Sequence, residues 1–237
     1  MISSVILTKN KASNIVSAID SASFSNEVIV VDDYSTEATA EIARKLRAKI
    51  FKRRLAGDFA SQRNFGLSKA KGDWVFFLDA DETVTPRLRR EIIKSTNLKI
   101  FKYSGYWIRR KNLFLGKVVG EDKVLRLAKK DAGRWERRVH EEWKVKGRVG
   151  TLKGYLVHDT AVSLREAISK TNYYSTLHAT ANIEEGKRSS LFRIIFFPAG
   201  KLLENLAYGK GFTFALLHSL HSFLAWSKQW LLQQKLA

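Results

Sequence analysis

Two aspartates separated by a single alanine follow a dense apolar run. The run is Trp74-Val-Phe-Phe-Leu, and Asp79-Ala80-Asp81-Glu82 comes directly after it. Unbroken apolar residues are typical of a strand buried on both faces of a parallel sheet, where ligand chemistry collects at the carboxyl ends of strands. Close carboxylates repel each other unless a cation lies between them, and their hard oxygens suit Mg²⁺ or Mn²⁺ carrying a phosphate. The pattern indicates a metal-diphosphate site, and the alternative is a surface loop or a set of acidic residues introducing a helix at Pro86.

The elements that would position these aspartates alternate along the first half of the chain. Short β-branched runs at 5–7 and 28–31 are followed by helical spacing at 12–22 and 37–46. A further strand fits 49–52 and a further helix fits 59–70, just before the aspartate-tipped strand. This alternation predicts a parallel sheet with right-handed crossovers. Neither a Walker loop nor a dinucleotide-type glycine turn follows the first two strands, so a nucleotide must be held in another way.

Composition narrows the chemistry and the partners. The 237 residues contain 42 Lys and Arg against 23 Asp and Glu, which gives a formal charge of +19 and implies an anionic partner. The absence of cysteine excludes disulfides, a thiol nucleophile and a cysteine-ligated zinc. The first residues enter a strand-like run and lack the features of a signal peptide, so we expect a chain kept in the cytosol.

Four motifs occur in order over the first half of the chain. They are Ile6-Leu-Thr8-Lys9-Asn10, Val30-Val31-Asp32-Asp33-Tyr34-Ser35-Thr36-Glu37, Gln62-Arg63-Asn64-Phe65-Gly66 and Leu78-Asp79-Ala80-Asp81-Glu82. In this order the chain resembles family 2 glycosyltransferases of the GT-A fold, especially the small bacterial enzymes that add a sugar to lipopolysaccharide or lipooligosaccharide core. The resemblance implies an α/β fold with a mostly parallel, Rossmann-like sheet. It predicts a catalytic domain over residues 1–160 and a helical, membrane-associating region over 161–237.

The resemblance also assigns the donor side of the site. It implies that the nucleobase and ribose lie beside Leu7, Thr8, Asn10 and Asp33. A carboxylate can accept a hydrogen bond from a uracil ring nitrogen, which makes Asp33 the best candidate for base recognition. The alternative for Asp32 and Asp33 is a helix cap shared with Ser35 and Thr36. Lys11 departs from the acidic residue that often follows the asparagine of the first motif, which removes one expected donor contact.

The third and fourth motifs are expected to meet at the diphosphate. The resemblance implies that Arg63 faces the donor, where it could pair with a phosphate or with nearby carboxylates, and the alternative is a surface arginine lying along its helix. It places Asp79 by the ribose and uracil, and Asp81 on the Mg²⁺ or Mn²⁺ ion that bridges the diphosphate. A divalent ion there neutralises the charge that develops on the leaving nucleoside diphosphate.

A general base and a further metal ligand are expected later in the chain. The resemblance maps a His-Glu pair onto His140 and Glu141, with Glu141 as the base that takes the acceptor proton. Glu142 stays open as an alternative base, and so does an exposed acidic pair that balances neighbouring arginines. His158 ends a strand-like run and could complete the metal site beside Asp81, although an isolated histidine there could simply be hydrogen-bonded.

The C-terminal third is apolar and helical in pattern. Helical spacing covers 164–183, and two apolar blocks follow at 191–208 and 212–232. The unbroken part of the second block spans only about 22 Å as a helix, short of the roughly 30 Å hydrocarbon slab. Basic residues flank the aromatic-rich segment, namely Arg188, Arg193, Lys201 and Lys210. This favours a peripheral or monotopic contact with the anionic cytoplasmic face of a bacterial inner membrane. The alternative is packing against the catalytic domain or a second copy of the chain.

Together these features predict an inverting, metal-dependent transferase that uses a nucleotide-sugar donor, with UDP-hexose favoured, and a lipid-linked saccharide acceptor. An enzyme alternative is a polyprenyl-phosphate sugar transferase, whose phosphate acceptor needs no strong base. An alternative from another class is a basic nucleic-acid-binding protein. We disfavour that reading because the positive charge is not concentrated on a recognition helix and the aspartates would repel a phosphate backbone.

Overall fold

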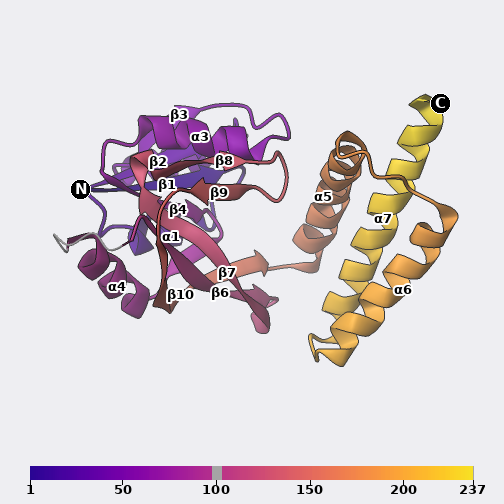
Figure 1. The fold of residues 1–237 in the computed structure, drawn as a ribbon. Coiled ribbons are helices and arrows are strands. Elements are labelled where there is room, and N and C mark those ends of the chain that lie inside the picture. The colour runs from indigo at the N-terminus through magenta and orange to yellow at the C-terminus, as the bar shows by residue number, and fades with distance from the viewer. Residues whose placement is uncertain (98–102, 237) are drawn as a thin grey trace. The chain divides into compact units, whose positions relative to one another are not determined.

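The computed structural model describes residues 1–97 and 103–236, so Ala237, at the end of the predicted C-terminal region, lies outside the described residues. In chain order the strands are β1 (Ile2–Thr8), β2 (Glu27–Asp32), β3 (Lys49–Lys52), β4 (Trp74–Asp79), β5 (Glu82–Val84), β6 (Gly105–Phe114), β7 (Lys117–Lys129), β8 (Gly133–Glu136), β9 (Glu142–Val145) and β10 (Val149–Ala161) (Figure 1). The helices are α1 (Ile15–Ser21), α2 (Thr39–Lys45), α3 (Phe59–Lys69), α4 (Pro86–Asn97), α5 (Leu164–Glu184), α6 (Leu191–Ala207) and α7 (Phe212–Leu236).

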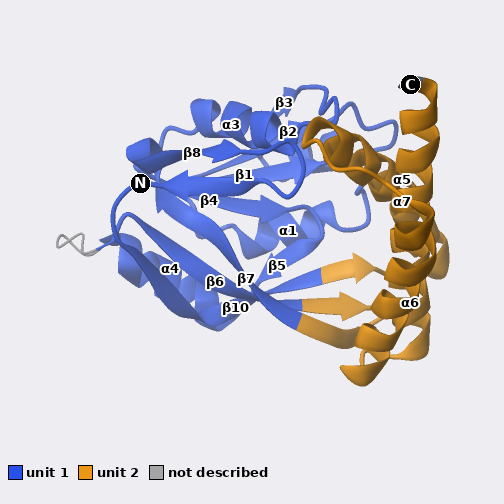
Figure 2. Ribbon diagram, turned by 45° about the vertical axis from the view of Figure 1, so that its right-hand side comes forward, with its two compact units in different colours: residues 1–111, 121–158 blue, residues 112–120, 159–237 orange. Residues whose placement is uncertain are grey.

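The chain forms two compact units. The first comprises residues 1–111 and 121–158, and the second comprises 112–120 and 159–237 (Figure 2). The tip of the β6–β7 hairpin therefore groups with the C-terminal helices, which the sequence pattern did not indicate. The functional division at residue 160 stays a prediction.

The first unit is built on an eight-stranded sheet. Its strand order is β3-β2-β1-β4-β7-β6-β10-β5, and the neighbours β3, β2, β1 and β4 run parallel to one another. Thr8 pairs with Asp32 and Leu7 pairs with Asp79, so β1, β2 and β4 all end at the same edge. The predicted α/β fold with a mostly parallel sheet and C-terminal helices is confirmed.

Alternate residues of the central strands build two hydrophobic cores. Phe76 and Leu78 of β4 contribute to the core covered by α1, α2 and α4, whereas Val75 and Phe77 contribute to the core covered by α3 and the β8–β9 hairpin. Burial on both faces explains why β4 reads as a continuous apolar run rather than an alternating one. A Cβ at Gly66 would lie 2.5 Å from a Val5 methyl, so the glycine lets α3 approach β1 closely.

The β8–β9 hairpin rests on β4 through three aromatic rings. Trp135 and Trp143 are cross-strand partners and stack with ring centroids 5.3 Å apart. Both rings meet Phe77 edge-on, at 5.1 and 5.0 Å. Such aromatic contacts add to the burial of large apolar side chains. The loop 137–141, which connects the two strands, is thereby held near the carboxyl end of β4.

The second unit contains α5, α6 and α7. Ser163 and Ser190 cap α5 and α6 by accepting hydrogen bonds from the amides three residues later. Polar side chains join α5 to α7, where Lys228 Nζ donates to Asn172 and Ser175 at 2.8 Å. Within the described part of the chain, no helix combines the length and hydropathy needed to cross a bilayer.

Candidate active site at the carboxyl edge of the sheet

Asp79 ends β4 between two arginines from different elements. Its Oδ1 accepts a hydrogen bond from Arg63 of α3 at 2.9 Å, and its Oδ2 accepts one from Arg126 of β7 at 2.6 Å. Burial alone would raise the pKa of Asp79, but the nearby guanidinium groups of Arg126 and Arg63 outweigh it and hold that pKa well below its ordinary value. Asp79 is therefore a fixed negative charge at the edge of the sheet.

Arg63 links Asp79 to the loop of the β8–β9 hairpin. Its Nε donates to Glu141 Oε1 at 2.8 Å, and its guanidinium lies 4.8 Å above the Trp135 ring. Because its side chain is only 3% exposed, the alternative of a surface arginine is wrong. Burial alone would lower the pKa of Arg63, but the carboxylates of Asp79 and Glu141 outweigh it and raise the pKa. One terminal nitrogen of Arg63 is buried with no hydrogen-bond partner among the described residues.

Asp81 lies in the turn between β4 and β5, beside two nitrogen-bearing side chains. His158 of β10 is opposite Glu82 of β5, which brings its Nε2 to 3.6 Å from Asp81 Oδ1. Lys11, from the loop after β1, has its Nζ 3.3 Å from Asp81 Oδ2. The carboxylate oxygens of Asp81 suit Mg²⁺ or Mn²⁺ as ligands, and the imidazole nitrogen of His158 suits Mn²⁺. Within residues 1–97 and 103–236, no group of three or more acidic or histidine side chains gathers as a metal cage.

The nucleobase side of the predicted site is formed by the loops after β1 and β2. Asp33 Oδ2 accepts from Lys9 Nζ at 2.8 Å and its Oδ1 accepts from the Leu55 amide at 3.0 Å. Asp32 accepts from the amide and hydroxyl of Ser35 and so closes the turn after β2, whereas α2 begins after Ala38 without a side-chain cap. The Thr8 hydroxyl is buried without a hydrogen-bond partner among the described residues. A buried polar atom of this kind is usually satisfied by a ligand or water.

Two further donor-side residues serve the loop geometry. The Asn10 amide donates to Ser35 Oγ and its side-chain oxygen accepts from the Thr36 amide, at 2.9 and 2.8 Å. The Leu7 carbonyl accepts from the Ala80 amide at 3.2 Å. The structure thus brings Leu7 beside the Asp79–Asp81 turn, and Asn10 joins the first loop to the second.

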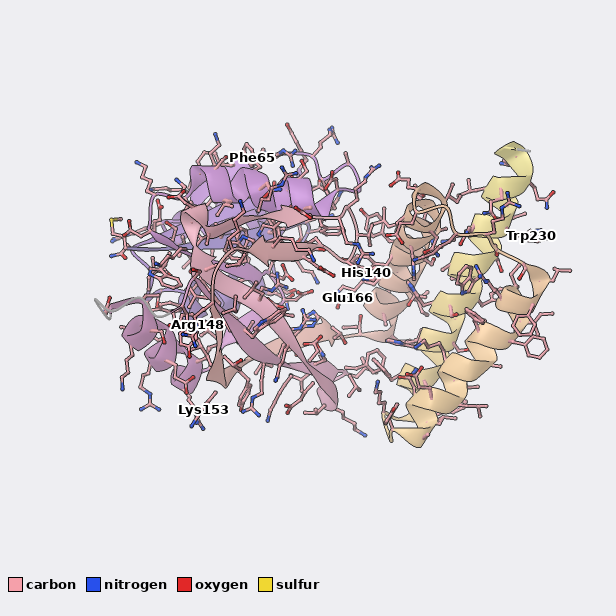
Figure 3. The ribbon with its side chains drawn as sticks, in the orientation of Figure 1. Phe65, His140, Arg148, Lys153, Glu166 and Trp230 are labelled. Carbon is pink, nitrogen blue, oxygen red and sulfur yellow. The ribbon has the colours of Figure 1, made fainter. Side chains whose placement is uncertain are left out.

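The two candidate bases differ in their surroundings. Glu141 is 16% exposed and paired with Arg63, whereas the Glu142 side chain is 49% exposed. Glu142 accepts a hydrogen bond from Lys144, which lowers the pKa of Glu142, and lies 3.7 Å from Arg137. His140, which Figure 3 labels, lies in the loop between β8 and β9. It is exposed and has a positive φ of 55°. The structure therefore joins Glu141, Arg63 and Asp79 in one cluster and leaves Glu142 on the surface.

The N-terminal part of the chain can be assigned to a family. Residues 3–99 match the sequence profile described as Glycosyl transferase family 2. These residues therefore carry a family 2 glycosyltransferase domain, and relatives of the chain are named glycosyltransferases. An uncharacterized glycosyltransferase of Rickettsia typhi is 28% identical over 253 residues, which cover 96% of this chain and 86% of that protein. The lipopolysaccharide core biosynthesis glycosyltransferase LpsC of Rhizobium meliloti is 29% identical over 209 residues, covering 83% of this chain and 77% of that protein.

Solved structures share the fold of this glycosyltransferase. S. aureus TarS 1-349 in complex with UDP has a TM-score of 0.51 and 15% identity, and the match covers 99% of this chain and 91% of that one. Glucosyl-3-phosphoglycerate synthase from Mycobacterium tuberculosis, in complex with Mn²⁺, UDP and phosphoglyceric acid, has a TM-score of 0.51 and 16% identity, with 80% of each chain covered. At these identities the likeness shows the GT-A fold alone.

The match of residues 3–99 to an enzyme family favours an enzyme over the nucleic-acid-binding alternative.

The third motif of this glycosyltransferase supports the site from three sides. Gln62 donates to the Arg53 carbonyl and accepts from its guanidinium, which fixes the segment after β3. Arg63 binds the two carboxylates, as described above. Asn64 exchanges two hydrogen bonds with the Trp135 backbone, at 2.8 and 2.9 Å, and so fastens the β8–β9 hairpin to α3.

Sequence reasoning missed three members of the glycosyltransferase site. Glu82 is fully buried, accepts from the Asp79 amide at 2.9 Å, and is also bound by Arg110 and Arg126 at 3.0 and 3.2 Å. One signal was available, since Arg126 interrupts the apolar run Val124-Leu125-Arg126-Leu127-Ala128. A charged residue inside a buried strand requires a partner of opposite charge.

Proposed function

We propose that this glycosyltransferase moves a sugar, with inversion, from a UDP-sugar to a lipid-linked saccharide at the cytoplasmic face of a bacterial inner membrane. The observation that carries the proposal is the Glu141–Arg63–Asp79 cluster beside Asp81 and His158. It combines one carboxylate, Glu141, that is paired with Arg63, and a second carboxylate, Asp81, that is suited to a metal ion. TarS was solved with UDP, and the Mycobacterium tuberculosis synthase with Mn²⁺ and UDP, which supports a UDP donor and a divalent ion.

On the donor side, Asp33 accepts a hydrogen bond from the uracil ring and the Thr8 hydroxyl bonds to the nucleoside. Asp79 lies toward the ribose, held in place by Arg63 and Arg126. Asp81 and His158 would hold the divalent ion. When bound, the ion supplies positive charge to the leaving diphosphate. The unpartnered Arg63 nitrogen is a further donor for a phosphate oxygen.

On the acceptor side, Glu141 takes the proton of the attacking hydroxyl. The bond from acceptor oxygen to sugar carbon forms while the bond from that carbon to the diphosphate oxygen breaks, and the electron pair leaves with UDP. Arg63 Nε holds Glu141 through Oε1 only, and Oε2 takes no part in that bond. Direct displacement requires the base on the face opposite the leaving group, and this geometry gives inversion.

The test compares Glu141→Gln with Glu142→Gln in transfer from UDP-hexoses to a lipooligosaccharide acceptor. Loss of a general base reduces the rate by roughly 10²–10⁴-fold. We therefore expect this loss in Glu141→Gln, with UDP binding retained, and near wild-type transfer in Glu142→Gln. Calorimetric titration should show tighter UDP binding with Mn²⁺ than in EDTA, and Asp81→Ala should abolish that difference. Full transfer by Glu141→Gln to a polyprenyl phosphate would instead support the polyprenyl-phosphate alternative.

Membrane contact is proposed for the second unit. Large apolar side chains are exposed along α6, namely Leu191, Phe192, Ile195, Phe196, Phe197 and Leu203. Exposed apolar surface of this extent indicates a binding face, and the nearby Arg188, Arg193 and Lys210 give it the positive charge that anionic lipid attracts. The name of the relative LpsC is consistent with an acceptor anchored in lipid.

Flotation with vesicles of phosphatidylethanolamine and phosphatidylglycerol tests this contact. We expect binding that falls by at least about tenfold in Phe192→Ser/Phe196→Ser, because each buried aromatic side chain contributes about 1.5–3 kcal/mol. Neutral phosphatidylcholine vesicles should bind the wild type more weakly. Unchanged vesicle binding, together with loss of a dimer in light scattering of the double variant, would assign this face to a second copy of the chain.

A further inference from the structure

Lys11 occupies the space beside the carboxylate proposed to hold the metal ion. Its Nζ lies 3.3 Å from Asp81 Oδ2, and the two side chains are only 16% and 14% exposed. β1 and β4 are neighbours with Leu7 opposite Asp79, so the loops after both strands must meet at this edge. The contact is therefore a consequence of sheet register rather than of a flexible surface lysine.

The backbone of Lys11 is fixed from both directions. Its amide donates to Thr39 Oγ1 at 2.8 Å, and its carbonyl accepts from the Ile15 amide at 2.9 Å, which begins α1. Only the side chain can therefore move. A lysine ammonium is a compact point charge on a flexible stem, able to change partners without movement of the backbone.

We propose that Lys11 is a second cation of the diphosphate site, which competes with the divalent ion for Asp81 in the nucleotide-free enzyme and binds the donor diphosphate once it arrives. This inference rests on the donor site of the proposed function. An ammonium group this close to Asp81 repels an incoming divalent ion, because like charges at short range in a partly buried site are weakly screened. Because the lysine stem is flexible, the same ammonium could turn from Asp81 to a diphosphate bound beside it.

Two equilibrium measurements on Lys11→Met test both halves of the proposal. The variant keeps an unbranched side chain and removes the charge. We expect its Mn²⁺ affinity without nucleotide to rise by about tenfold, because the competing charge is gone. We expect its affinity for UDP in EDTA to fall by at least about tenfold, because a charge-assisted hydrogen bond is lost. Mn²⁺ binding is read by electron paramagnetic resonance and UDP binding by calorimetry, so neither depends on turnover.

Lys45→Met is the charge-matched control. Lys45 pairs with Glu41 on the surface of α2, with both side chains largely exposed, so the same loss of charge should leave both affinities unchanged. Equal Mn²⁺ affinity in wild type and Lys11→Met, or no Mn²⁺ binding by either, overturns the competition. Equal UDP affinity in EDTA, or none in the wild type, overturns the diphosphate contact.

The two proposals fail in different ways. If the wild type binds UDP in the presence of Mn²⁺ but Lys11→Met has unchanged affinities, the inference on Lys11 is overturned and the donor site stands. If the wild type binds UDP under no condition, both are overturned.

Discussion

Replacing Arg126 by methionine removes the centre of a buried charge network. Arg126 is 6% exposed and donates to Asp79 at 2.6 Å and to Glu82 at 3.2 Å. Each charged hydrogen bond contributes about 1.5–3 kcal/mol. Asp79 keeps Arg63 and Glu82 keeps Arg110, so neither carboxylate is left without a cation. The loss should therefore lie below the roughly 3–5 kcal/mol of a fully broken buried pair. We expect the free energy of unfolding to fall by about 2–3 kcal/mol.

Urea unfolding at neutral pH, followed by tryptophan fluorescence, measures this loss at constant m-value. The control is Lys111→Met, which removes an equal charge from a half-exposed pair with Glu121 at 3.6 Å and should cost less than about 1 kcal/mol. A loss below about 1 kcal/mol for Arg126→Met would refute the reasoning that this network stabilises the fold.

The variant should also change the pH dependence of stability. The pKa of Asp79 is lowered in the folded protein, so its contribution is present above the ordinary aspartate pKa of about 4 and is lost as the pH falls through the depressed value. Without Arg126 the pKa of Asp79 rises and this contribution shrinks. The difference in unfolding free energy between wild type and variant should therefore narrow once the pH falls below the pKa of Asp79 in the folded variant.

Three further substitutions test interactions that hold the first unit together. Asn64→Ala removes two hydrogen bonds to the Trp135 backbone and should cost about 1–3 kcal/mol in urea unfolding and lower kcat, because the loop 137–141 loosens. Glu27→Gln should cost about 1–3 kcal/mol at neutral pH. Burial alone would raise the pKa of Glu27, but three hydrogen bonds outweigh it and lower the pKa, so the loss should diminish as the pH falls below about 4. Gly66→Ala should cost about 1–3 kcal/mol because its Cβ meets Val5.

Each of these has a contradicting result. If Asn64→Ala is destabilised but its kcat is unchanged, the attachment of the β8–β9 hairpin to α3 is not needed for catalysis. A pH-independent loss in Glu27→Gln would contradict the lowered pKa of that carboxyl group. For Gly66, the double variant Gly66→Ala/Val5→Ala should lose less unfolding free energy than the sum of the two single losses, because the smaller side chain at position 5 makes room for the new Cβ. Full additivity of the two losses would exclude the steric contact.

The parallel half of the sheet was predictable because its signals are local. The expected strand at 49–52 matches β3, and the expected helix at 59–70 is α3 with one residue fewer. The first helix begins at Ile15 rather than residue 12, because Lys11 and Asn14 form a turn that is tied to the next loop. The long strands β6 and β7 lack a clean alternating pattern, because runs of consecutive polar and charged residues interrupt them, at 109–112 in β6 and at 121–123 in β7. Their pairing depends on contacts far apart in the chain.

The site shows the same division between local and distant information. Asp79 and Asp81 could be placed at a strand end from the apolar run that precedes them. The partners of Asp79 could not, because Arg126 lies 47 residues away and reaches it only through the pairing of β4 with β7. The contact between Lys11 and Asp81 likewise depends on the neighbouring positions of β1 and β4 in the sheet.

Under the proposed function, the aromatic contacts below the β8–β9 hairpin link the acceptor side of the site to its donor side. Phe77 lies two residues before Asp79 on the same strand and carries both Trp135 and Trp143. A displacement of β4 would therefore carry the loop of Glu141 with it, and the separation between Glu141 and Asp79 would be preserved. Under the proposed function, substitutions in the loop before Glu141 could then change the acceptor, while the stacked rings below keep Glu141 in place. One hairpin would then determine two properties independently, with its loop selecting the acceptor and its stacked rings fixing the position of Glu141.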